Sequence, residues 1–394
     1  MRCVGTVVRG IRTPIIKEND DLASIVVNSL LDAQKNEGFN FRDRDVVAIT
    51  EAVVGISEGN YVTVDNISTD IVDKFPSKKI GIVYPILSRN RFSMILKGLA
   101  RGMDKITVLL SFPSDEVGND ILNKETLDNS KYNLSSVISE KEYEETFGDF
   151  LHPFTGINMV KFYRDLIESE NCKAEFVFSN NPKDILNYTN DILTCDIHSR
   201  FKTKKILQDS GANVYGLFEV MNKPIDGSGF NPEYGLLGSN KSTEERLKLF
   251  PKTGVELVNK IQKLLKEKTG KTIEVMVYGD GAFKDPVGGI WELADPVVSP
   301  AYTSGLEGTP NEIKLKYISD NKFADLKGDE LKSAIKEEIK NKGKDLKGNM
   351  LSQGTTPRRL TDLIGSLCDL TSGSGDKGTP VVFIQGYFDN LSDE

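Results

Sequence analysis

The stretch 275–281 of this sequence reads Val-Met-Val-Tyr-Gly-Asp-Gly, and the rest of the chain can be organised around it. Val275, Met276 and Val277 form a short apolar run, which predicts a buried strand. The two glycines that follow bracket Asp280 just past the expected strand end, where a backbone without Cβ atoms lets a phosphate or a metal ion approach closely. A polar turn after a core strand is the alternative interpretation of the same residues.

The run that follows this turn also favours a functional role. Between Trp291, the only tryptophan, and Pro310, the chain is rich in glycine, proline, aromatic and acidic residues without an internal repeat. Ordering such a long loop costs conformational entropy, and long ordered loops are therefore usually functional.

The composition bounds the class of protein. The chain has 394 residues, enough for two or three domains, and its 38% hydrophobic and 27% charged residues are typical of a globular protein. The net charge of −8 argues against general nucleic-acid binding, so local clusters of Arg and Lys would have to hold an anionic ligand. No apolar run reaches the length of a membrane span, and we expect no signal peptide. Scattered cysteines favour a cytoplasmic protein with reduced thiols, and two histidines exclude a multi-histidine metal site.

Short apolar runs and helical spacing of apolar residues predict the other elements. The expected strands are 4–9, 45–49, 80–83, 106–110, 175–178 and 381–384. The expected helices are 22–31, 92–101, 184–193, 242–250, 255–269 and 361–370. Gly270 is the expected end of the helix 255–269. Strands and helices alternate between about residues 78 and 225, as in an α/β unit with parallel pairing, whereas the polar segment 119–150 is expected to be a surface excursion.

Three clusters of arginine are candidates for holding an anionic ligand. They are Arg89 with Arg91, Arg200 with the lysines that follow it, and Arg358 with Arg359. Each cluster follows an expected strand or loop beside Ser, Thr or Asn, and Arg binds carboxylate and phosphate oxygens with two parallel hydrogen bonds. The alternative is that each cluster belongs to a solvated surface.

Asp196 and His198 precede the second arginine cluster and form a candidate proton-transfer pair. A histidine with a purely structural role is the alternative. We hypothesise that this pair and the three arginine clusters converge on the acceptor or on nucleotide phosphates, across a cleft from Asp280.

Two glycine-rich loops add candidate ligand groups. The loop 372–380 lies between an expected helix and strand, and its backbone N–H groups and Lys377 could hold an anion, although the spacing is not that of a P-loop. A flexible linker is the alternative. The loop 226–241 carries Asp226 and Glu233, which could join Asp280 around Mg²⁺ or Mn²⁺, since these hard cations prefer oxygen ligands.

These loops, in this order, resemble the coenzyme F420-0:L-glutamate ligase (γ-glutamyl ligase) family. The likeness covers somewhat under half of the chain, in the blocks 10–22, 45–59, 231–240, 255–280 and 361–386. The resemblance implies an α+β fold with an F420 ligase-like mixed core, formed by residues 1–62 and 226–394. In this scheme the α/β unit 63–225 is an insertion into that core.

The resemblance also implies the reaction. The family joins glutamate through a γ-linkage to a carboxylate acceptor, using a nucleotide and a divalent metal, through an acyl phosphate. We therefore expect GTP or ATP and Mg²⁺ or Mn²⁺ as cofactors, and L-glutamate and an anionic carboxylate acceptor as partners. We expect a homodimer, and neither nucleic acid nor membrane as a partner. Asp280 matches a metal-binding Asp of the family. The implied nucleotide contacts are Thr13, Pro14, Ile15, Ile16, Asn240, Gly373, Ser374, Gly375, Asp376 and Lys377.

The sequence departs from the family pattern at three positions. Leu237 stands where the family has its first metal-binding Asp, Ile56 where it has a nucleotide-contacting Lys, and Ser374 where it has an acid. Two alternatives follow: a folate-type polyglutamate ligase, and a non-catalytic nucleotide or metabolite sensor on the same fold. A flat wall for a pterin-like or flavin-like ring could come from Phe283, Trp291 or Tyr302.

Overall fold

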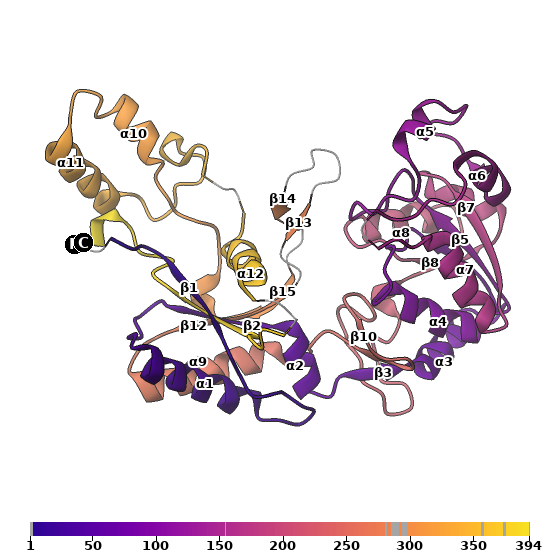
Figure 1. Ribbon diagram of the computed structural model, residues 1–394, viewed down its shortest axis with the longest axis horizontal. Coiled ribbons are helices and arrows are strands. Elements are labelled where there is room, and N and C mark those ends of the chain that lie inside the picture. Colours follow the sequence, from indigo (N-terminus) through magenta and orange to yellow (C-terminus); the bar gives the residue numbers. More distant parts are fainter. Residues whose placement is uncertain are drawn as a thin grey trace. The chain divides into compact units, whose positions relative to one another are not determined.

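The computed structural model describes residues 3–153, 155–279, 282–284, 291–293, 298–355, 358–372 and 376–393, with the backbone alone for 282–284, 291–293 and 298. The described chain divides into two compact units (Figure 1). The first unit contains Met1–Ser57 and resumes at Thr253, and the second unit contains Glu58–Lys252. The second unit includes the glycine-rich loop 226–241. That this unit is an insertion into a ligase-like core stays a prediction.

A mixed five-stranded sheet forms the centre of the first unit. Its order is β1 (Val7–Ile11), β16 (Val381–Gln385), β2 (Val46–Thr50), β12 (Glu274–Gly279) and β15 (Val298–Tyr302). Strands β2 and β12 pair in parallel, and the other neighbours pair antiparallel. The strand expected at 275–277 is confirmed, and β12 is buried along its whole length. Strands from the two ends of the sequence therefore lie side by side.

Helices cover both faces of this sheet (Figure 1). On one face, α1 (Leu22–Glu37) and α9 (Gly254–Thr269) pack against the side chains of Val275 and Val277. On the other face, α12 (Leu360–Thr371) packs against Met276 and Tyr278. The expected end of α9 is confirmed, because Gly270 adopts a left-handed conformation with φ 70° and its N–H bonds the carbonyl of Lys266.

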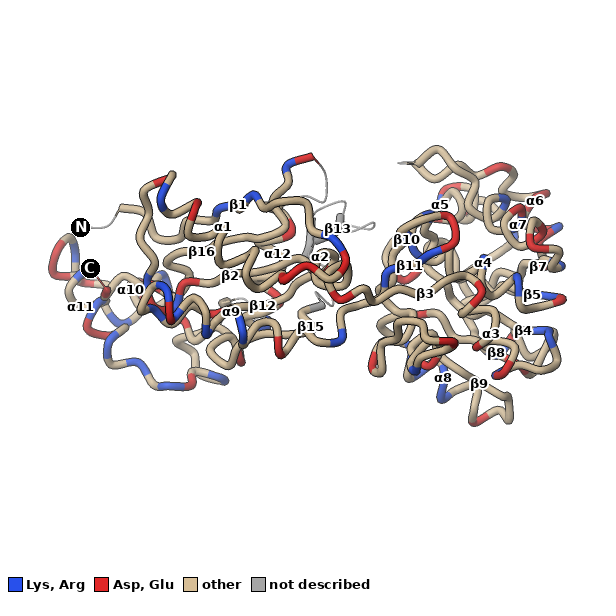
Figure 2. Tube along the Cα trace, turned by 90° about the horizontal axis from the view of Figure 1, so that it is seen from below, with Lys and Arg blue, Asp and Glu red and all other residues tan. Residues whose placement is uncertain are grey.

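A smaller core holds the C-terminal part of this unit. Helix α11 (Gly328–Asn341) buries Ile335 and Ile339 with three other apolar residues from 313–346. Lys, Asp and Glu are interspersed along this helix (Figure 2). The remaining elements of the unit are α2 (Glu51–Ser57), β13 (Ala282–Lys284), β14 (Trp291–Leu293), η3 (Ser304–Leu306), α10 (Leu315–Asn321), η4 (Met350–Ser352) and η5 (Leu391–Asp393).

The second unit is built on a six-stranded, mostly parallel sheet. Its order is β6 (Ile138–Ser139), β7 (Lys173–Phe178), β5 (Lys105–Leu110), β4 (Lys79–Val83), β8 (Asp191–Thr194) and β9 (Asn213–Gly216). All neighbours except β6 and β7 are parallel. In chain order, the parallel strands start with β4 and continue outward through β5 to β7. The chain then returns, and β8 and β9 are added on the other side of β4. Such a sheet is doubly wound, with its topological switch point between β4 and β8.

Helices cover both faces of this second sheet as well. One face carries α3 (Val64–Lys74), α4 (Phe92–Gly102) and α7 (Met159–Ser169), and the other carries η1 (Pro182–Asn187) and α8 (Arg200–Gln208). The unit also contains α5 (Lys124–Asp128), α6 (Glu140–Phe147), η2 (Leu217–Glu219) and a small sheet of β10 (Asn240–Thr243), β11 (Arg246–Lys248) and β3 (Tyr61–Thr63).

Three expectations for this unit are wrong. The segment 242–250 forms strands of a hairpin instead of a helix, because β11 pairs with the distant β3 and buries Leu247. The segment 184–193 contains η1 and the start of β8, since Ile192 and Leu193 pair with β4 and β9. The segment 119–150 is anchored, because β6 joins the sheet edge and its neighbours bury side chains in the core. Long-range pairing overrode the local pattern in each case.

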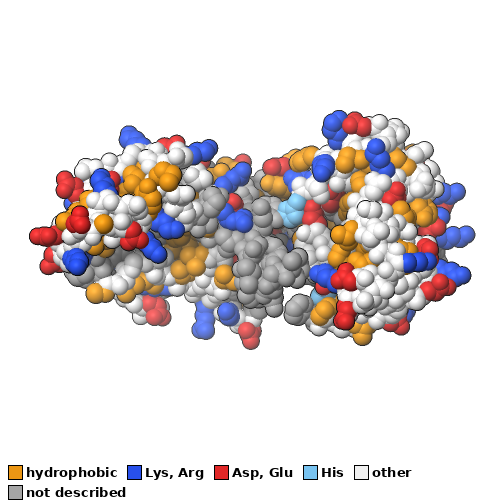
Figure 3. Space-filling view, turned by 90° about the horizontal axis from the view of Figure 1, so that it is seen from above, with side chains coloured by type: hydrophobic (Ala, Val, Ile, Leu, Met, Phe, Trp, Pro, Cys, Tyr) orange, Lys and Arg blue, Asp and Glu red, His pale blue; other side chains and the backbone are white. Residues whose placement is uncertain are grey.

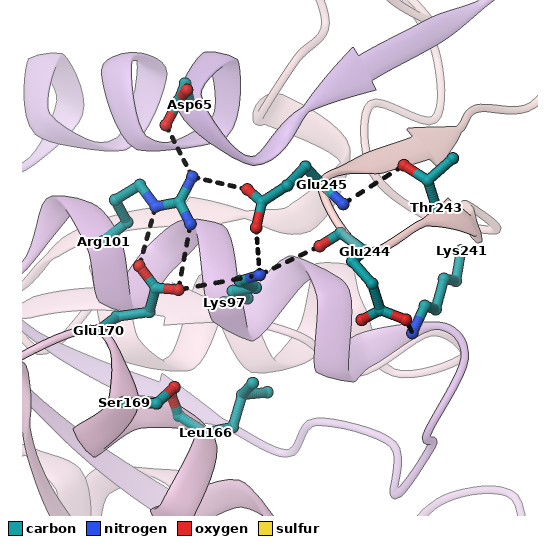
Figure 4. Close-up of polar contacts among 10 residues, drawn as sticks. All are labelled: Asp65, Lys97, Arg101, Leu166, Ser169, Glu170, Lys241, Thr243, Glu244 and Glu245. Carbon is teal, nitrogen blue, oxygen red and sulfur yellow. Dashed lines mark hydrogen bonds and ion pairs between the residues drawn. The ribbon is translucent and has the colours of Figure 1, made fainter.

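Ion pairs tie the β10–β11 turn to the helices (Figure 4). The guanidinium of Arg101 on α4 donates to Glu170 after α7 at 2.8 and 3.1 Å, to Asp65 on α3 at 2.8 Å, and to Glu245 at 2.8 Å. Lys97, one turn earlier on α4, also contacts Glu245. The hydrogen bonds from Arg101 and Lys97 lower the pKa of Glu245 to about 2. Four separate segments are thus joined by one arginine.

Two observations concern the surface. Among the helices that the structure describes, none combines the length with the apolar composition needed to cross a membrane. On the face shown in Figure 3, cationic and anionic side chains are interspersed with hydrophobic ones among the described residues. An anionic ligand on this face therefore has to be held by local groups.

Candidate functional site

The carboxyl ends of β2 and β12 meet at one edge of the first unit's sheet. Thr50 on β2 is paired with Tyr278 on β12, so the residues that follow each strand are neighbours. The residue after β2 is Glu51, which is only 8% exposed. A Cβ atom at Gly279 would lie 2.7 Å from Cγ of Glu51, so the glycine makes room for this acid. Asp280 lies outside the described residues.

Segments from the two ends of the chain also meet at this edge. The N–H of Thr13 donates to the carbonyl of Gly378 at 3.3 Å, and the N–H of Thr50 donates to the carbonyl of Pro380 at 3.0 Å. A Cβ atom at Gly10 would lie 3.1 Å from Cβ of Thr379. The N-terminal segment that resembles a nucleotide-contacting entry is therefore in direct contact with the end of the C-terminal glycine-rich loop.

Hydroxyl groups fix the start of that loop. The hydroxyls of Tyr278 and Ser372 hydrogen-bond to each other, and burial raises the pKa of Tyr278. This contact anchors the end of α12 to the end of β12. The Oγ1 atom of Thr379 is buried and has no hydrogen-bond partner within the described part of the chain. A buried hydroxyl without a partner can accept or donate to a ligand oxygen.

The expected nucleotide contacts divide between several environments. Thr13 and Pro14 lie at the edge just described, Ile15 is 88% exposed, and Ile16 is buried in the core. Asp376 and Lys377 are exposed, whereas Gly373, Ser374 and Gly375 lie outside the described residues. Asn240 belongs to the second unit, where it begins β10. The first unit thus gathers Thr13 and Pro14 with the 376–380 segment, and the nucleotide contacts themselves stay predictions.

The expected metal ligands are not gathered among the residues that the structure describes. Asp226 and Glu233 are exposed residues of the second unit, and Asp226 occupies a turn with φ 48°. Within the described residues, no three His, Cys, Asp or Glu side chains converge as metal ligands. Because Asp280 lies outside those residues, the metal set stays a prediction. Leu237 packs in the second unit's core and is 7% exposed, so its side chain has a structural role.

The second unit brings together two of the expected polar clusters. Strands β4 and β8 are neighbours, so the loops that follow them meet at the carboxyl edge of the sheet. The first loop carries Arg89, which is exposed, and Arg91, which is the N-cap residue of α4. The second carries Asp196, which is 1% exposed, and His198, which is exposed; Arg200 then begins α8. Residues far apart in the sequence thus share one edge.

Two acids that sequence analysis missed hold these loops. The carboxylate of Asp115 accepts the N–H of Leu87 at 2.8 Å, which fixes the loop after β4. The carboxylate of Glu116 accepts the N–H groups of Ile197 at 2.5 Å, His198 at 2.7 Å and Ser199 at 3.0 Å, which fixes the loop after β8. Their position soon after an expected strand was the signal available in the sequence.

The third arginine cluster belongs to the first unit. Arg359 is the N-cap residue of α12, and Ser372 is its C-cap residue. Since the helix has 12 residues, the two ends are separated by roughly 18 Å along its axis. Arg358 and Arg359 therefore lie at the opposite end of α12 from the glycine-rich loop. The expected convergence of all three clusters on one ligand, and the catalytic roles of their arginines, Asp196 and His198, stay predictions.

The first unit defines a class of protein. A carboxylate beside a strand end and a polar segment that meets the N-terminal strand are groups from which sheet edges build ligand sites. The chain belongs to the F420-0:gamma-glutamyl ligase family, because the model of that family matches residues 10–386. The family consists of nucleotide-dependent ligases, and membership implies γ-glutamyl ligase activity with glutamate and F420-0 as substrates. None of the individually curated proteins matches the chain.

Proposed function

We propose that this chain is a nucleotide- and divalent-metal-dependent ligase that forms a γ-glutamyl amide bond on a carboxylate acceptor through an acyl phosphate. Membership of the ligase family supports the class of reaction. The observation that carries the proposal is the edge of the first unit, where Glu51, Thr13 and the 376–380 segment meet. These groups come from three distant parts of the chain, and they combine a buried carboxylate with exposed backbone and hydroxyl groups.

The reaction has two steps. In the first, an oxygen of the acceptor carboxylate attacks the γ-phosphorus of GTP or ATP, so that an acyl phosphate forms and the nucleoside diphosphate leaves. In the second, the amine of glutamate attacks the acyl carbon, the new C–N bond forms, and inorganic phosphate leaves while the nitrogen loses a proton. Phosphoryl transfer of this kind depends on positioning and charge neutralisation more than on a side-chain nucleophile.

The residues at this edge suit those tasks. Backbone N–H groups of the 372–379 loop, the hydroxyl of Thr379 and the ammonium of Lys377 can hold phosphate oxygens. Glu51 and Asp280, which follows Gly279 in the sequence, would hold Mg²⁺ or Mn²⁺, because both offer the oxygen ligands that these ions prefer. When bound, the ion would neutralise phosphate charge. The carboxylate of Glu51 fits such an ion, since it offers oxygen ligands at the strand end beside Gly279.

Purified protein incubated with GTP or ATP, MnCl₂, L-glutamate and an acceptor tests the proposal. We expect release of inorganic phosphate that requires both glutamate and acceptor, and a product heavier by one glutamyl residue in mass spectrometry. Parallel reactions with F420-0 and with a folate distinguish the two acceptors. If the nucleotide binds but no product forms with either acceptor, the proposed function is wrong and the sensor alternative takes its place.

The assembly and location of the protein also stay predictions. We expect a homodimer, in the cytoplasm, with neither nucleic acid nor membrane as a partner. Light scattering behind a size-exclusion column measures the molar mass in solution. A mass of one chain at micromolar concentration would contradict the dimer without affecting the proposed reaction.

A further inference from the structure

The switch point of the second unit's sheet places two loops opposite each other. The loop after β4 leads to α4 on one face of the sheet, and the loop after β8 leads to α8 on the other face. Because the two loops turn away from each other, the carboxyl ends of β4 and β8 are left between them. In open α/β sheets, ligands bind at this position. The topology therefore predicts a ligand-binding position between the carboxyl ends of β4 and β8.

Three buried polar atoms at this edge lack hydrogen-bond partners. They are Oη of Tyr84, Oδ1 of Asp196 and Nε of Arg200, and none has a partner within the described part of the chain. Asp196 is 1% exposed, and its other oxygen accepts the hydroxyl of Thr203 at 2.6 Å. The hydroxyl of Ser199 hydrogen-bonds to Glu116 at 3.2 Å and also lies near enough to Asp196 to favour its charged form. Nearly all buried polar groups in native proteins are paired, so three such atoms at one switch point indicate a missing partner.

Tyr84 and Asp196 follow neighbouring strands, because Val83 on β4 is paired with Thr194 on β8. Burial raises the pKa of Tyr84, and the negative charges of Asp184 and Asp196 act in the same direction. The oxygens of Asp184 are already occupied by Ser179 at 2.5 Å and Asn181 at 3.1 Å. The charge of Asp196 therefore acts on the hydroxyl of Tyr84, and Oδ1 of Asp196 has no hydrogen-bond partner within the described residues. The Tyr84 hydroxyl donates to neither Asp184 nor Asp196. A group between Tyr84 and Asp196 would have to donate to the carboxylate.

The backbone of Tyr84 supports the same interpretation. Its φ of 55° lies in the left-handed region, which is unfavourable for a residue other than glycine. Residues held in such conformations are concentrated at ligand sites, because the surrounding structure has to compensate for the strain. The conformation turns the chain at the end of β4, where the N–H of Tyr84 still bonds the carbonyl of Leu109 on β5.

Arg200 supplies the positive charge at this edge. One Nη atom donates to the carbonyl of Ile197 at 2.5 Å, which leaves the Nε–H without a partner. The carboxylate of Glu116 already occupies the N–H groups of Ile197, His198 and Ser199, which directly precede α8. An incoming anion would therefore be held by the guanidinium of Arg200, with Arg89 exposed on the opposite loop.

We propose that the switch-point edge of the second unit binds a small organic anion that also carries an amino or hydroxyl group. The amino or hydroxyl group donates to Oδ1 of Asp196 and lies against the hydroxyl of Tyr84. The carboxylate or phosphate of the same molecule accepts the Nε–H of Arg200. Because the three atoms are buried, the loops 84–91 and 195–199 have to part for the ligand to enter. This binding does not depend on the ligase reaction proposed for the first unit.

Isothermal titration calorimetry on the full chain tests the proposal with two matched pairs of probes. L-aspartate is compared with succinate, which lacks the amino group, and glycerol 3-phosphate is compared with propyl phosphate, which lacks the hydroxyls. We expect the donor-carrying member of one pair to bind at least ten-fold more tightly than its analogue. The pair that shows this difference identifies the anion as a carboxylate or a phosphate. If neither donor-carrying probe binds, or if both bind no better than their analogues, the proposal is wrong.

Variants locate the binding. Asp196→Asn and Tyr84→Phe should each raise the Kd of the donor-carrying probe at least ten-fold, and Arg200→Gln should raise the Kd of both members of the pair. Tyr84→Phe removes only a hydroxyl without a partner, so this variant should fold even if Asp196→Asn does not. The matched control is Asp209→Asn on the exposed end of α8, which should leave the Kd unchanged.

Two further outcomes would overturn the proposal. Binding that is unchanged in Tyr84→Phe and Asp196→Asn but lost in Glu51→Gln would show that the probe occupies the first unit. A crystal structure grown with the tighter probe would also decide the matter. A single water molecule between Tyr84 and Asp196, with no probe present, would show that the edge holds structural water only.

Discussion

The two units of this chain each gather polar groups at one edge of a sheet, but they assemble the edge differently. In the first unit, Thr13, Glu51 and Gly378 come from opposite ends of the sequence, because β1 and β16 are paired. In the second unit, the groups come from successive strand–helix loops of a doubly wound sheet. Segments from the two ends of the chain can therefore form the same kind of edge as successive strand–helix loops. The order of strands and helices along the sequence predicts the edge only for the doubly wound sheet.

The two units also differ in how their glycine-containing segments are held. Buried amides fix the loop 229–238 of the second unit: Asn60 donates to the carbonyl of Phe250 at 2.7 Å, and Asn231 donates to the same carbonyl at 3.3 Å. In the first unit, the main contact is the close approach of the Gly279 backbone to the side chain of Glu51. We therefore expect packing changes to have the largest effect in the second unit and charge changes to have the largest effect in the first.

A substitution at Gly238 should break the second unit most severely. A Cβ atom there would lie 1.5 Å from the Phe250 ring, and the residue has φ 71°. Gly238→Ala therefore combines a steric clash with a left-handed conformation and should cost about 3 kcal/mol in the free energy of unfolding. Urea denaturation followed by circular dichroism measures this cost.

Gly211→Ala is the matched control for that substitution. Gly211 has φ 87°, but no described atom would lie within 4 Å of an added Cβ. Gly211→Ala should therefore lower the free energy of unfolding by only about 1 kcal/mol, which is the part caused by the left-handed backbone conformation. Equal losses for the two variants would show that the contact with Phe250 does not contribute.

Removal of the charge at Glu51 tests the first unit. Glu51→Gln keeps the shape of the side chain beside Gly279, but it removes the negative charge that we expect to hold a divalent ion. We expect kcat/KM of the ligase reaction to fall about 10²-fold, which corresponds to roughly 2.7 kcal/mol, with little change in thermal stability. Glu37→Gln, at the exposed end of α1, should keep full activity. A fully active Glu51→Gln would remove Glu51 from the site.

The ion-pair network gives a smaller effect on the second unit. Arg101→Met keeps an unbranched side chain but removes the hydrogen bonds to Glu170, Asp65 and Glu245 (Figure 4). Because the guanidinium is only partly exposed and its bond to Glu170 is bidentate, we expect a loss of about 1 kcal/mol. Lys161→Met, which removes an exposed pair with Asp165, should change the free energy of unfolding by less than about 0.5 kcal/mol. Similar losses in the two variants would contradict a special role for Arg101.

Acid should weaken both units slightly and by a similar amount. Hydrogen bonds from Ser24 and Lys260 lower the pKa of Asp21 in the first unit to about 2, and the pKa of Glu245 in the second unit is also about 2. Both values are below those of the unfolded chain, so the stabilisation is complete above pH of about 4.5 and is lost as the pH falls toward 2. Since both carboxylates are more than half exposed, each should contribute only a few tenths of a kcal/mol, about 0.5 at most.

The slope of stability against pH measures this contribution. Asp21→Asn and Glu245→Gln should each reduce the slope of the unfolding free energy between about pH 4.5 and pH 2. In the Arg101→Met background, Glu245→Gln should change the slope less, because the main partner of Glu245 is already absent. An unchanged slope in Glu245→Gln would show that the exposed pair is screened completely.

The sequence alone predicted those elements whose signal is local. The apolar run at 275–277 became β12, the helix ending at Gly270 became α9, and the run 381–384 became β16. Burial of an uninterrupted apolar run and a left-handed glycine at a helix end depend on neighbouring residues only. The family resemblance of the loops is confirmed by the family match over 10–386.

Only the tertiary structure decided which distant segments meet. No local pattern shows that 246–248 pairs with β3, that Glu51 lies beside Gly279, or that Glu116 holds the loop before α8. Each of these contacts depends on strand pairing between segments far apart in the chain, and backbone hydrogen bonds carry no residue-specific signature. The sequence by itself therefore determined where strands and polar loops begin and end, whereas pairing between distant strands decided which polar groups share an edge.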